Sequence, residues 1–207
     1  MLSYTIADSK EDLLGISSLQ KVNLPASLTE EECKKQGFVT VSHTYEQLKE
    51  LNDIEKHIIV KDGQKVVAYV LAMTEQSKYQ LPILVPMFEL FDSITFAGKT
   101  ISAYKYIVVG QVCIDKGYRG QGILEQSYAT YRKHFAGNYD FAITEIASNN
   151  LRSLQAHKRI GFIEIHRYIS PENIEWCIVL WNWRNDKQLA VKAEQQTADN
   201  SQGIHPL

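Results

Sequence analysis

The chain has 207 residues, of which 44% are hydrophobic and 22% are charged, so it can bury the core of one globular domain without structural disulfides or metals. Its formal net charge of −2 gives no sign of the basic surface that binds DNA or RNA, so we expect no nucleic-acid partner. No apolar run approaches the ~20 residues that cross a bilayer, and acidic residues interrupt positions 1–20. We therefore expect no membrane association and no signal peptide.

The cysteines Cys33, Cys113 and Cys177 lie far apart in the sequence and form no CxxC pair. This pattern disfavours a zinc site and a disulfide framework, and it is typical of a reducing compartment. We expect a cytoplasmic protein without a bound metal.

The first half of the chain alternates between strand-like and helical segments. The elements predicted there, in chain order, are a strand over 4–8, helices over 9–24, 29–37 and 44–52, and a pair of strands over 56–73. Thr29 and Glu32 have the spacing of a capping box, and Gly37 can end the helix that they begin. Asp62-Gly63 separates two β-branched runs and predicts a tight hairpin.

The second half opens with a segment that Pro82 and Pro86 make irregular, and over 80–104 we predict a loop with one short helix. A strand over 105–115 follows, and Gly110 inside it indicates a bulge or a close approach of backbone. The remaining predicted elements are helices over 122–135 and 150–160 and strands over 139–147, 161–169 and 174–183.

This order of elements predicts an α+β fold with a mixed sheet, because hairpins occur early and strand–helix–strand units occur later. We expect one domain over 1–185. Residues 186–207 are polar with little to bury, and we predict a mobile tail there.

The turn "YRGQGI" joins the strand over 105–115 to the helix that follows it. The first turn of a helix leaves backbone N–H groups unpaired, and glycine removes the Cβ atoms that would keep an anion away. Gly120 and Gly122, beside the permanent charge of Arg119, therefore suit a phosphate group. The same glycines are equally compatible with a tight turn that binds nothing.

Other phosphate-binding loops fit this stretch less well. No Walker sequence is present. A dinucleotide-binding fingerprint needs a third glycine where Glu125 stands, although Asp140 or Glu145 could supply its later acidic residue. A dinucleotide-dependent oxidoreductase stays open as an alternative.

Two motifs in this part of the chain resemble those of the GNAT family of N-acetyltransferases. In that family's acetyl-CoA loop, Arg or Gln is followed three residues later by Gly and two residues further by Gly or Ala. Arg119 and Gly122 match this pattern, and Leu124 departs from its final small residue. The second motif lies in "NLRSLQAHKRIGF", where the matching residues are Asn150, Ser153, Gly161 and Phe162. The resemblance covers about residues 105–170 through these motifs, and residues 1–75 only through the order of their elements.

The resemblance implies a mixed, mostly antiparallel sheet with a splayed parallel strand pair and flanking helices. It also implies an acyl-CoA-dependent N-acetyltransferase that moves an acetyl group from acetyl-CoA to a primary amine by direct attack in a ternary complex. The acceptor would be a small-molecule or peptide amine. The departures at Leu124 and His157 keep open a catalytically degenerate member that binds acyl-CoA as a sensor or partner-binding module.

The resemblance further implies that the pantetheine arm of acetyl-CoA lies beside 112–114 and that its pyrophosphate lies on the backbone of 119–124. The implied cofactor contacts are Val112, Cys113, Ile114, Arg119, Gly120, Gln121, Gly122, Ile123, Leu124, Asn150 and Ser153. Cys113 fits strand packing better than covalent catalysis, because no histidine is adjacent to it in sequence.

Two side chains are candidates for proton transfer. Glu145 shares one strand face with Phe141 and Ile143, and it either takes a proton from the acceptor ammonium or points into solvent. His157 stands where the family often has a tyrosine, and it either protonates the leaving thiolate or lies on the helix surface. The tryptophans near the last strand fit core packing or the surface of a homodimer.

Overall fold

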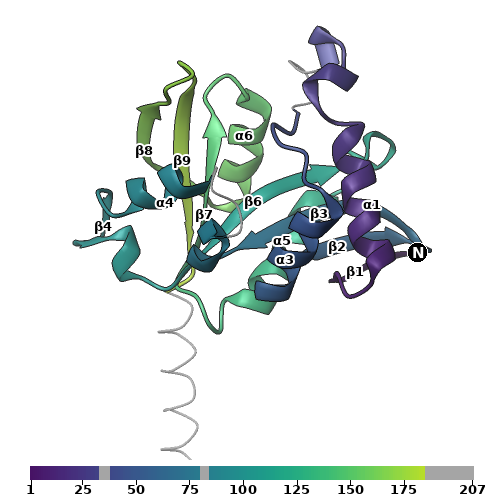
Figure 1. Ribbon diagram of the computed structural model, residues 1–207, viewed down its shortest axis with the longest axis horizontal. Helices are drawn as coiled ribbons and strands as arrows, with labels where there is room; N and C mark the ends of the chain where they lie inside the picture. Colours follow the sequence, from purple (N-terminus) through teal and green to yellow (C-terminus); the bar gives the residue numbers. More distant parts are fainter. Residues whose placement is uncertain (33–37, 80–83, 185–207) are drawn as a thin grey trace, which may run out of the picture.

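The computed structural model describes residues 1–32, 38–79 and 84–184 (Figure 1). The helices are α1 (Lys10–Lys21), α3 (Tyr45–Ile54), α4 (Val85–Phe91), α5 (Ile123–Phe135) and α6 (Leu151–Ile160). The strands are β1 (Leu2–Ile6), β2 (Ile58–Asp62), β3 (Lys65–Met73), β4 (Thr95–Phe96), β5 (Lys99–Thr100), β6 (Tyr106–Ile114), β7 (Phe141–Ala147), β8 (Ile163–Ile169) and β9 (Glu175–Asn182).

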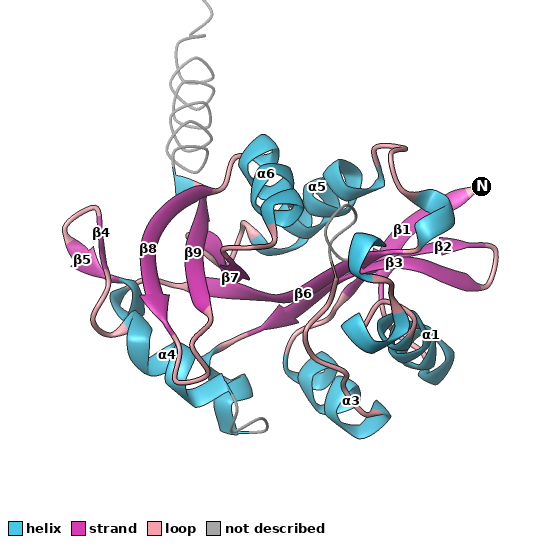
Figure 2. Cartoon of the chain, turned by 90° about the horizontal axis from the view of Figure 1, so that it is seen from above, coloured by secondary structure: helices cyan, strands magenta, loops and turns pink. Residues whose placement is uncertain are grey.

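The main sheet has seven strands in the order β1-β2-β3-β6-β7-β9-β8. Neighbouring strands pair antiparallel, except that β6 and β7 pair in parallel. Figure 2 shows α5 and α6 on one face of this sheet and α1, α3 and α4 on the other. The α+β prediction, with a mostly antiparallel sheet and one parallel pair, is confirmed.

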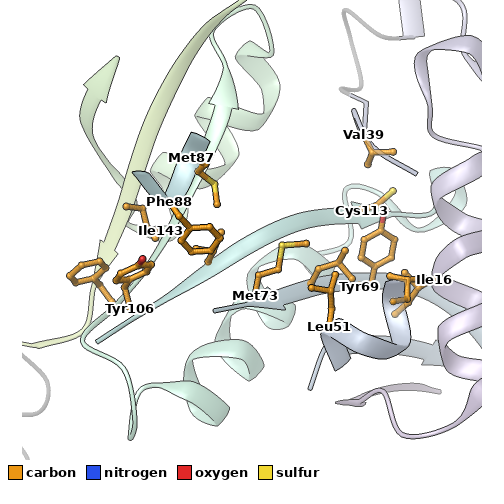
Figure 3. Close-up of a cluster of buried hydrophobic side chains, with 14 of the residues drawn as sticks. Ile16, Val39, Leu51, Tyr69, Met73, Met87, Phe88, Tyr106, Cys113 and Ile143 are labelled. Carbon is orange, nitrogen blue, oxygen red and sulfur yellow. The ribbon is translucent and has the colours of Figure 1, made fainter. Parts of the chain in front are cut away.

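Each face of the sheet carries its own hydrophobic cluster. On the face covered by α1, α3 and α4, the side chains of Tyr69, Phe91 and Phe141 are fully buried, and Figure 3 draws part of this cluster. On the face covered by α5 and α6, Tyr128 and Trp183 are fully buried. Burying a side chain of this size stabilises the fold by about 1.5–3 kcal/mol. The two clusters therefore hold both layers of helices against the sheet.

The bulge predicted at Gly110 is present. Val109 pairs with Ala72 and Gln111 pairs with Leu71, so Gly110 is the extra residue on β6. A Cβ atom at Gly110 would lie 2.3 Å from the Cε atom of Met73, so the position has no room for a side chain unless Met73 moves.

The parallel strands β6 and β7 separate just before this bulge. Their backbone pairing ends at Val108 and Ile143, and the hydroxyl of Thr144 then donates a hydrogen bond to the carbonyl oxygen of Val109 at 2.7 Å. Beyond that point the two strands run apart (Figure 1). Among the described residues, the edge of β6 that faces β7 therefore has no strand partner over 110–114.

The elements with strong local signals form as predicted. The Asp62-Gly63 turn joins β2 to β3, with Gly63 at φ 58°, and Thr29 and Glu32 form the reciprocal hydrogen bonds of a capping box. Residues 33–37, which include the predicted end of that helix, lie outside the described residues, as does the polar tail over 186–207.

Two differences from the predictions have local causes. The first strand begins at Leu2, earlier than predicted, because it pairs along β2 as far as Asp62. Within 80–104, α4 is the predicted short helix, but the hairpin β4–β5 was not predicted. Its turn has positive φ at both Ala97 (48°) and Gly98 (84°), and alanine gives no turn signal at such a position.

Candidate active site

The glycine turn before α5 forms an open backbone cradle. Gly120 has φ 75° and Gly122 has φ 74°, a left-handed conformation that favours glycine. Gly122 is the N-cap of α5 and has no side chain that could cap the first turn of that helix. A Cβ atom at either glycine would meet no atom of the described residues within 4 Å. This arrangement suits an anion.

A cavity of about 350 Å³ lies between this turn, the C-terminal half of β6 and the start of α6. The predicted site residues that line it are Val112, Cys113, Ile114, Arg119, Gly120, Gly122, Ile123, Leu124, Asn150, Ser153 and His157. Gln121 is not among the lining residues, and its side-chain amide donates to the carbonyl oxygen of Gly117 at 3.1 Å. The two sequence motifs therefore meet on the walls of one cavity.

The side chain of Arg119 holds the glycine turn in place through two hydrogen bonds. Its Nε donates to the carbonyl oxygen of Ile114 at 3.0 Å, and its Nη2 donates to Oδ1 of Asn23 at 2.5 Å. The side chain therefore ties the end of β6 to the segment that follows α1. This bracing was not predicted from the sequence, because Asn23 lies 96 residues away along the chain.

Asn150 begins α6 by accepting a hydrogen bond from the backbone N–H of Ser153 at 3.3 Å, and Gly161 ends the helix at φ 113°. Between these ends α6 lines the cavity with several residues that were not predicted. The lining residues that sequence reasoning missed are Asn23, Phe38, Val39, Glu125, Arg152, Gln155, Ala156 and Arg159. For those on α6, the spacing of 152, 155, 156 and 159 on one helix face was the available signal.

His157 lies inside the protein and not on the helix surface, with 3% of the residue exposed. Its Nδ1 is 2.8 Å from the carbonyl oxygen of Ser153, which can only accept, so Nδ1 carries the proton. Nε2 then accepts from the hydroxyl of Tyr128 at 2.6 Å. Burial lowers the pKa of His157 to about 4, so the imidazole is neutral and both of its nitrogen atoms are engaged.

Glu145 does not line this cavity. It lies two residues beyond Ile143, where β7 has left β6, on the sheet face that also carries Phe141. Its Oε2 accepts a hydrogen bond from the hydroxyl of Tyr168 on β8 at 2.6 Å. Burial raises the pKa of Glu145 above its ordinary value, and the hydrogen bond from Tyr168 offsets part of that rise. Glu145 and His157 therefore belong to opposite faces of the sheet.

A partly buried polar network lies beside the bulge. Oε1 of Gln111 accepts hydrogen bonds from Tyr69 at 2.5 Å and from Gln20 at 2.9 Å, and Nε2 of Gln111 donates to the carbonyl oxygen of Val41 at 2.8 Å. The backbone N–H of His43 donates to Gln20 at 2.9 Å. These bonds fix the segment before α3 against β6, so that this segment forms one wall beside the separated strands.

Cys113 lines the cavity as a protonated thiol. Burial raises its pKa to about 12, and a thiol is a poor nucleophile compared with its thiolate. This favours strand packing over an acyl-enzyme role.

Two further features concern metals and membranes. Within 1–32, 38–79 and 84–184, no group of three or more His, Cys, Asp or Glu side chains is arranged to hold a metal ion. None of the helices in the described part of the chain is both long enough and apolar enough to cross a membrane.

The dinucleotide alternative does not fit this architecture. A dinucleotide-binding fold is built on a mostly parallel sheet. Of the described strands, β6 and β7 alone pair in parallel.

Comparisons with solved structures give the same fold. The ribosomal-protein-S18-alanine N-acetyltransferase from Escherichia coli has 9% identity over 88% of this chain and 94% of that chain, with a TM-score of 0.57. The NatC complex bound to Gag peptide and CoA gives 13% identity over 87% and 98%, with a TM-score of 0.58. A chimera of the spermidine N-acetyltransferase SpeG from Vibrio cholerae gives 14% identity over 89% and 96%, with a TM-score of 0.53. At these identities the likeness shows the fold alone.

A comparison with curated protein sequences gives no significant match. The family model described as "Acetyltransferase (GNAT) family" matches residues 26–162, which is more than half of the chain. The resemblance seen in the two motifs is thereby confirmed, and the chain belongs to the GNAT family of acetyltransferases.

Proposed function

We propose that this protein transfers an acetyl group from acetyl-CoA to a primary amine by direct attack in a ternary complex. The observation that carries the proposal is the cavity in which the start of α5 at Gly122 meets the edge of β6 that has no strand partner among the described residues. The solved N-acetyltransferases with this fold include one named for spermidine and one bound to a peptide and CoA, and they support an amine as the acceptor.

Acetyl-CoA fits the chemistry of the cavity walls. The backbone N–H groups at the start of α5 suit the pyrophosphate, because Gly120 and Gly122 have no Cβ atoms that would keep an anion away. The edge of β6 at 112–114 suits the amide-bearing pantetheine arm, which can pair with it as an added strand would. A backbone N–H near Ile114 is the proposed donor to the oxyanion that forms at the thioester carbonyl.

Glu145 is the proposed base. Its raised pKa favours taking a proton from an ammonium group near neutral pH, either directly or through a water molecule. The amine nitrogen then attacks the thioester carbonyl carbon. As the C–S bond breaks, the nitrogen gives up its second proton, which passes through water to the departing CoA thiolate, and the amide forms. The carboxylate lies where β6 and β7 have separated, so the gap between the strands is the proposed meeting place of acceptor and thioester.

His157 remains the proposed residue beside the leaving group. Its imidazole is neutral, with Nδ1 bound to Ser153 and Nε2 bound to Tyr128, so it has no proton that it can give up without breaking a hydrogen bond. We propose that His157 holds the cavity wall in place through these two hydrogen bonds. We also propose that the CoA thiolate leaves without needing a proton from a general acid of the protein.

An amine panel tests the proposal. The protein is incubated with acetyl-CoA and with spermidine, single amino acids, an aminoglycoside or a short peptide with a free N-terminus, and free thiol is measured. We expect thiol release that depends on one class of amine. Binding of CoA without thiol release for any amine would instead support the degenerate sensor, which the departures at Leu124 and His157 keep open.

A further inference from the structure

The two separated strands each carry one polar residue on the same face of the sheet, just beyond the point where they part. On β7 it is Glu145, two residues past Ile143, and on β6 it is Gln111, which follows the bulge. Gln111 pairs with Leu71, which belongs to the same hydrophobic cluster as Ile143, so Gln111 and Glu145 share this face. Gln111 therefore stands across the gap between the strands from Glu145.

The hydrogen bonds of Gln111 have one consistent assignment. The backbone N–H of His43 can only donate, so the Gln20 atom 2.9 Å from it is the oxygen, and Gln20 turns its NH2 group toward Gln111. Gln111 must then accept with its oxygen, which leaves its own NH2 group for the carbonyl oxygen of Val41 at 2.8 Å. Both ends of this network are backbone groups of residues 41–43, so the network ties these residues to β6.

Residues 38–43 form a wall that runs from the CoA cavity to the gap between the strands. Phe38 and Val39 line the cavity, whereas Val41 is bonded to Gln111 beside the bulge. The position of the wall at the gap therefore depends on Gln111.

We propose that Gln111 is a positioning residue for the acceptor amine, because by holding residues 38–43 against β6 it sets the width of the gap in which the amine meets Glu145. This inference rests on the proposed transfer reaction, and Gln111 acts through the wall and not on the reacting atoms. The CoA end of the wall is held separately, since the backbone N–H of Val39 donates to the carbonyl oxygen of Asn23 at 3.1 Å. Loss of Gln111 should therefore weaken binding of the amine and spare the binding of CoA.

The test uses the full chain with Gln111→Met, which replaces the amide by an unbranched side chain without its hydrogen-bonding groups. Gln47→Met is the matched control, because Gln47 accepts from the backbone N–H of Thr44 at 2.9 Å and so holds the end of the same segment without a bond to β6. Gln111→Met leaves the buried hydroxyl of Tyr69 without its acceptor, so it is also made in Tyr69→Phe, with Tyr69→Phe alone as the reference. Melting temperatures verify that the variants fold.

Steady-state kinetics are measured with acetyl-CoA and the amine of the panel that releases the most thiol. We expect Gln111→Met to raise KM for this amine about fivefold to tenfold, with kcat and the dissociation constant of CoA nearly unchanged. Hydrogen–deuterium exchange of the backbone over 39–43 should become faster in Gln111→Met. Gln47→Met should match the unmodified protein in KM and in the exchange of this stretch.

A fall in kcat with KM unchanged, or an equal loss of affinity for CoA, would overturn the role of Gln111 alone. So would faster exchange over 39–43 with KM unchanged, because the wall would then move without effect on the amine. A rise in KM of the same size in Gln47→Met would also overturn it, since general loosening of the segment would explain both results. If the unmodified protein releases no thiol with any amine, the proposed transfer fails and this inference fails with it.

Discussion

Glu145 is the residue on which the proposed chemistry depends. If it is the base, Glu145→Gln should lower kcat by about 100-fold or more and leave KM for the amine nearly unchanged. Raising the pH should restore part of the rate, because free amine becomes more abundant. If the carboxylate only binds the acceptor cation, the same change should mainly raise KM. Steady-state kinetics with the acceptor found in the amine panel distinguish the two roles.

Glu55 provides a matched control for that substitution. Its carboxylate also accepts a hydrogen bond from a tyrosine hydroxyl, that of Tyr139 at 2.6 Å, but this bond lies before the start of β7 and not where β7 separates from β6. Glu55→Gln should therefore leave kcat and KM unchanged. Equal effects of the two glutamine variants would remove Glu145 from the reaction.

Tyr168 should set the pH at which Glu145 works. Its hydroxyl donates to the charged form of the carboxylate and so lowers the pKa of Glu145, against the larger rise caused by burial. Tyr168→Phe removes that donor, so the acidic limb of the kcat profile should move to higher pH. Tyr139→Phe removes a bond of the same length to Glu55 and should leave the limb in place. A limb that stays fixed in Tyr168→Phe would mean that Glu145 does not control it.

At the scale of the element, the start of α5 should bind the ligand through its backbone. Gly122→Glu puts a side chain and a negative charge into the empty cradle, so it should abolish the thermal stabilisation that CoA gives the folded protein. Gly63→Glu is the control, since Gly63 also has positive φ and open space around it but lies in the β2–β3 turn. Both variants should lose about 1–2 kcal/mol of stability from backbone strain. Only Gly63→Glu should keep its response to CoA in a melting experiment.

The elements that could be predicted from the sequence are those with local signals. The hairpin at Asp62-Gly63 and the bulge at Gly110 depend on the conformational freedom of single glycines, which is visible in the sequence. The β4–β5 hairpin was missed because Ala97 takes a positive φ that alanine rarely adopts.

The candidate site could be predicted where it lies within one strand–turn–helix unit and not where it depends on distant contacts. The motif residues Gly122 and Asn150, which the resemblance implied as cofactor contacts, line the same cavity. The brace from Arg119 to Asn23 joins residues 96 apart, and the sequence gives no sign of which partner Arg119 finds. Strand alternation places Glu145 on the same sheet face as Phe141. The hydrogen bond from Tyr168 to Glu145 could not be predicted, because it depends on the pairing of β8 with β9 and of β9 with β7.

At the scale of the whole molecule, three buried histidines should make stability depend on pH. Burial lowers the pKa of His43 to about 4, of His57 to about 3 and of His157 to about 4. Each ring also accepts a hydrogen bond, from Gln20 to His43, from the backbone N–H of Ala72 to His57 and from Tyr128 to His157. Protonation would therefore bury a charge and remove an acceptor at once.

The sign of the effect follows from comparing the two states. In the unfolded chain these histidines titrate near pH ~6.5, so between that pH and about 4 the unfolded state binds protons that the folded state does not. The free energy of unfolding should fall as the pH drops below 6.5, by about 1.4 kcal/mol per pH unit for each histidine. Above pH 7 these residues should contribute no slope.

Urea denaturation at pH 5, 6, 7 and 8 measures this dependence. His157→Gln should remove about one third of the slope between pH 5 and 6, because the other two histidines still titrate. His134→Gln changes an exposed histidine on α5 and should leave the slope unchanged. Equal free energies of unfolding at pH 5 and pH 7 would contradict the prediction, since three neutral rings held in the folded state must then take up protons as readily as they do in the unfolded chain.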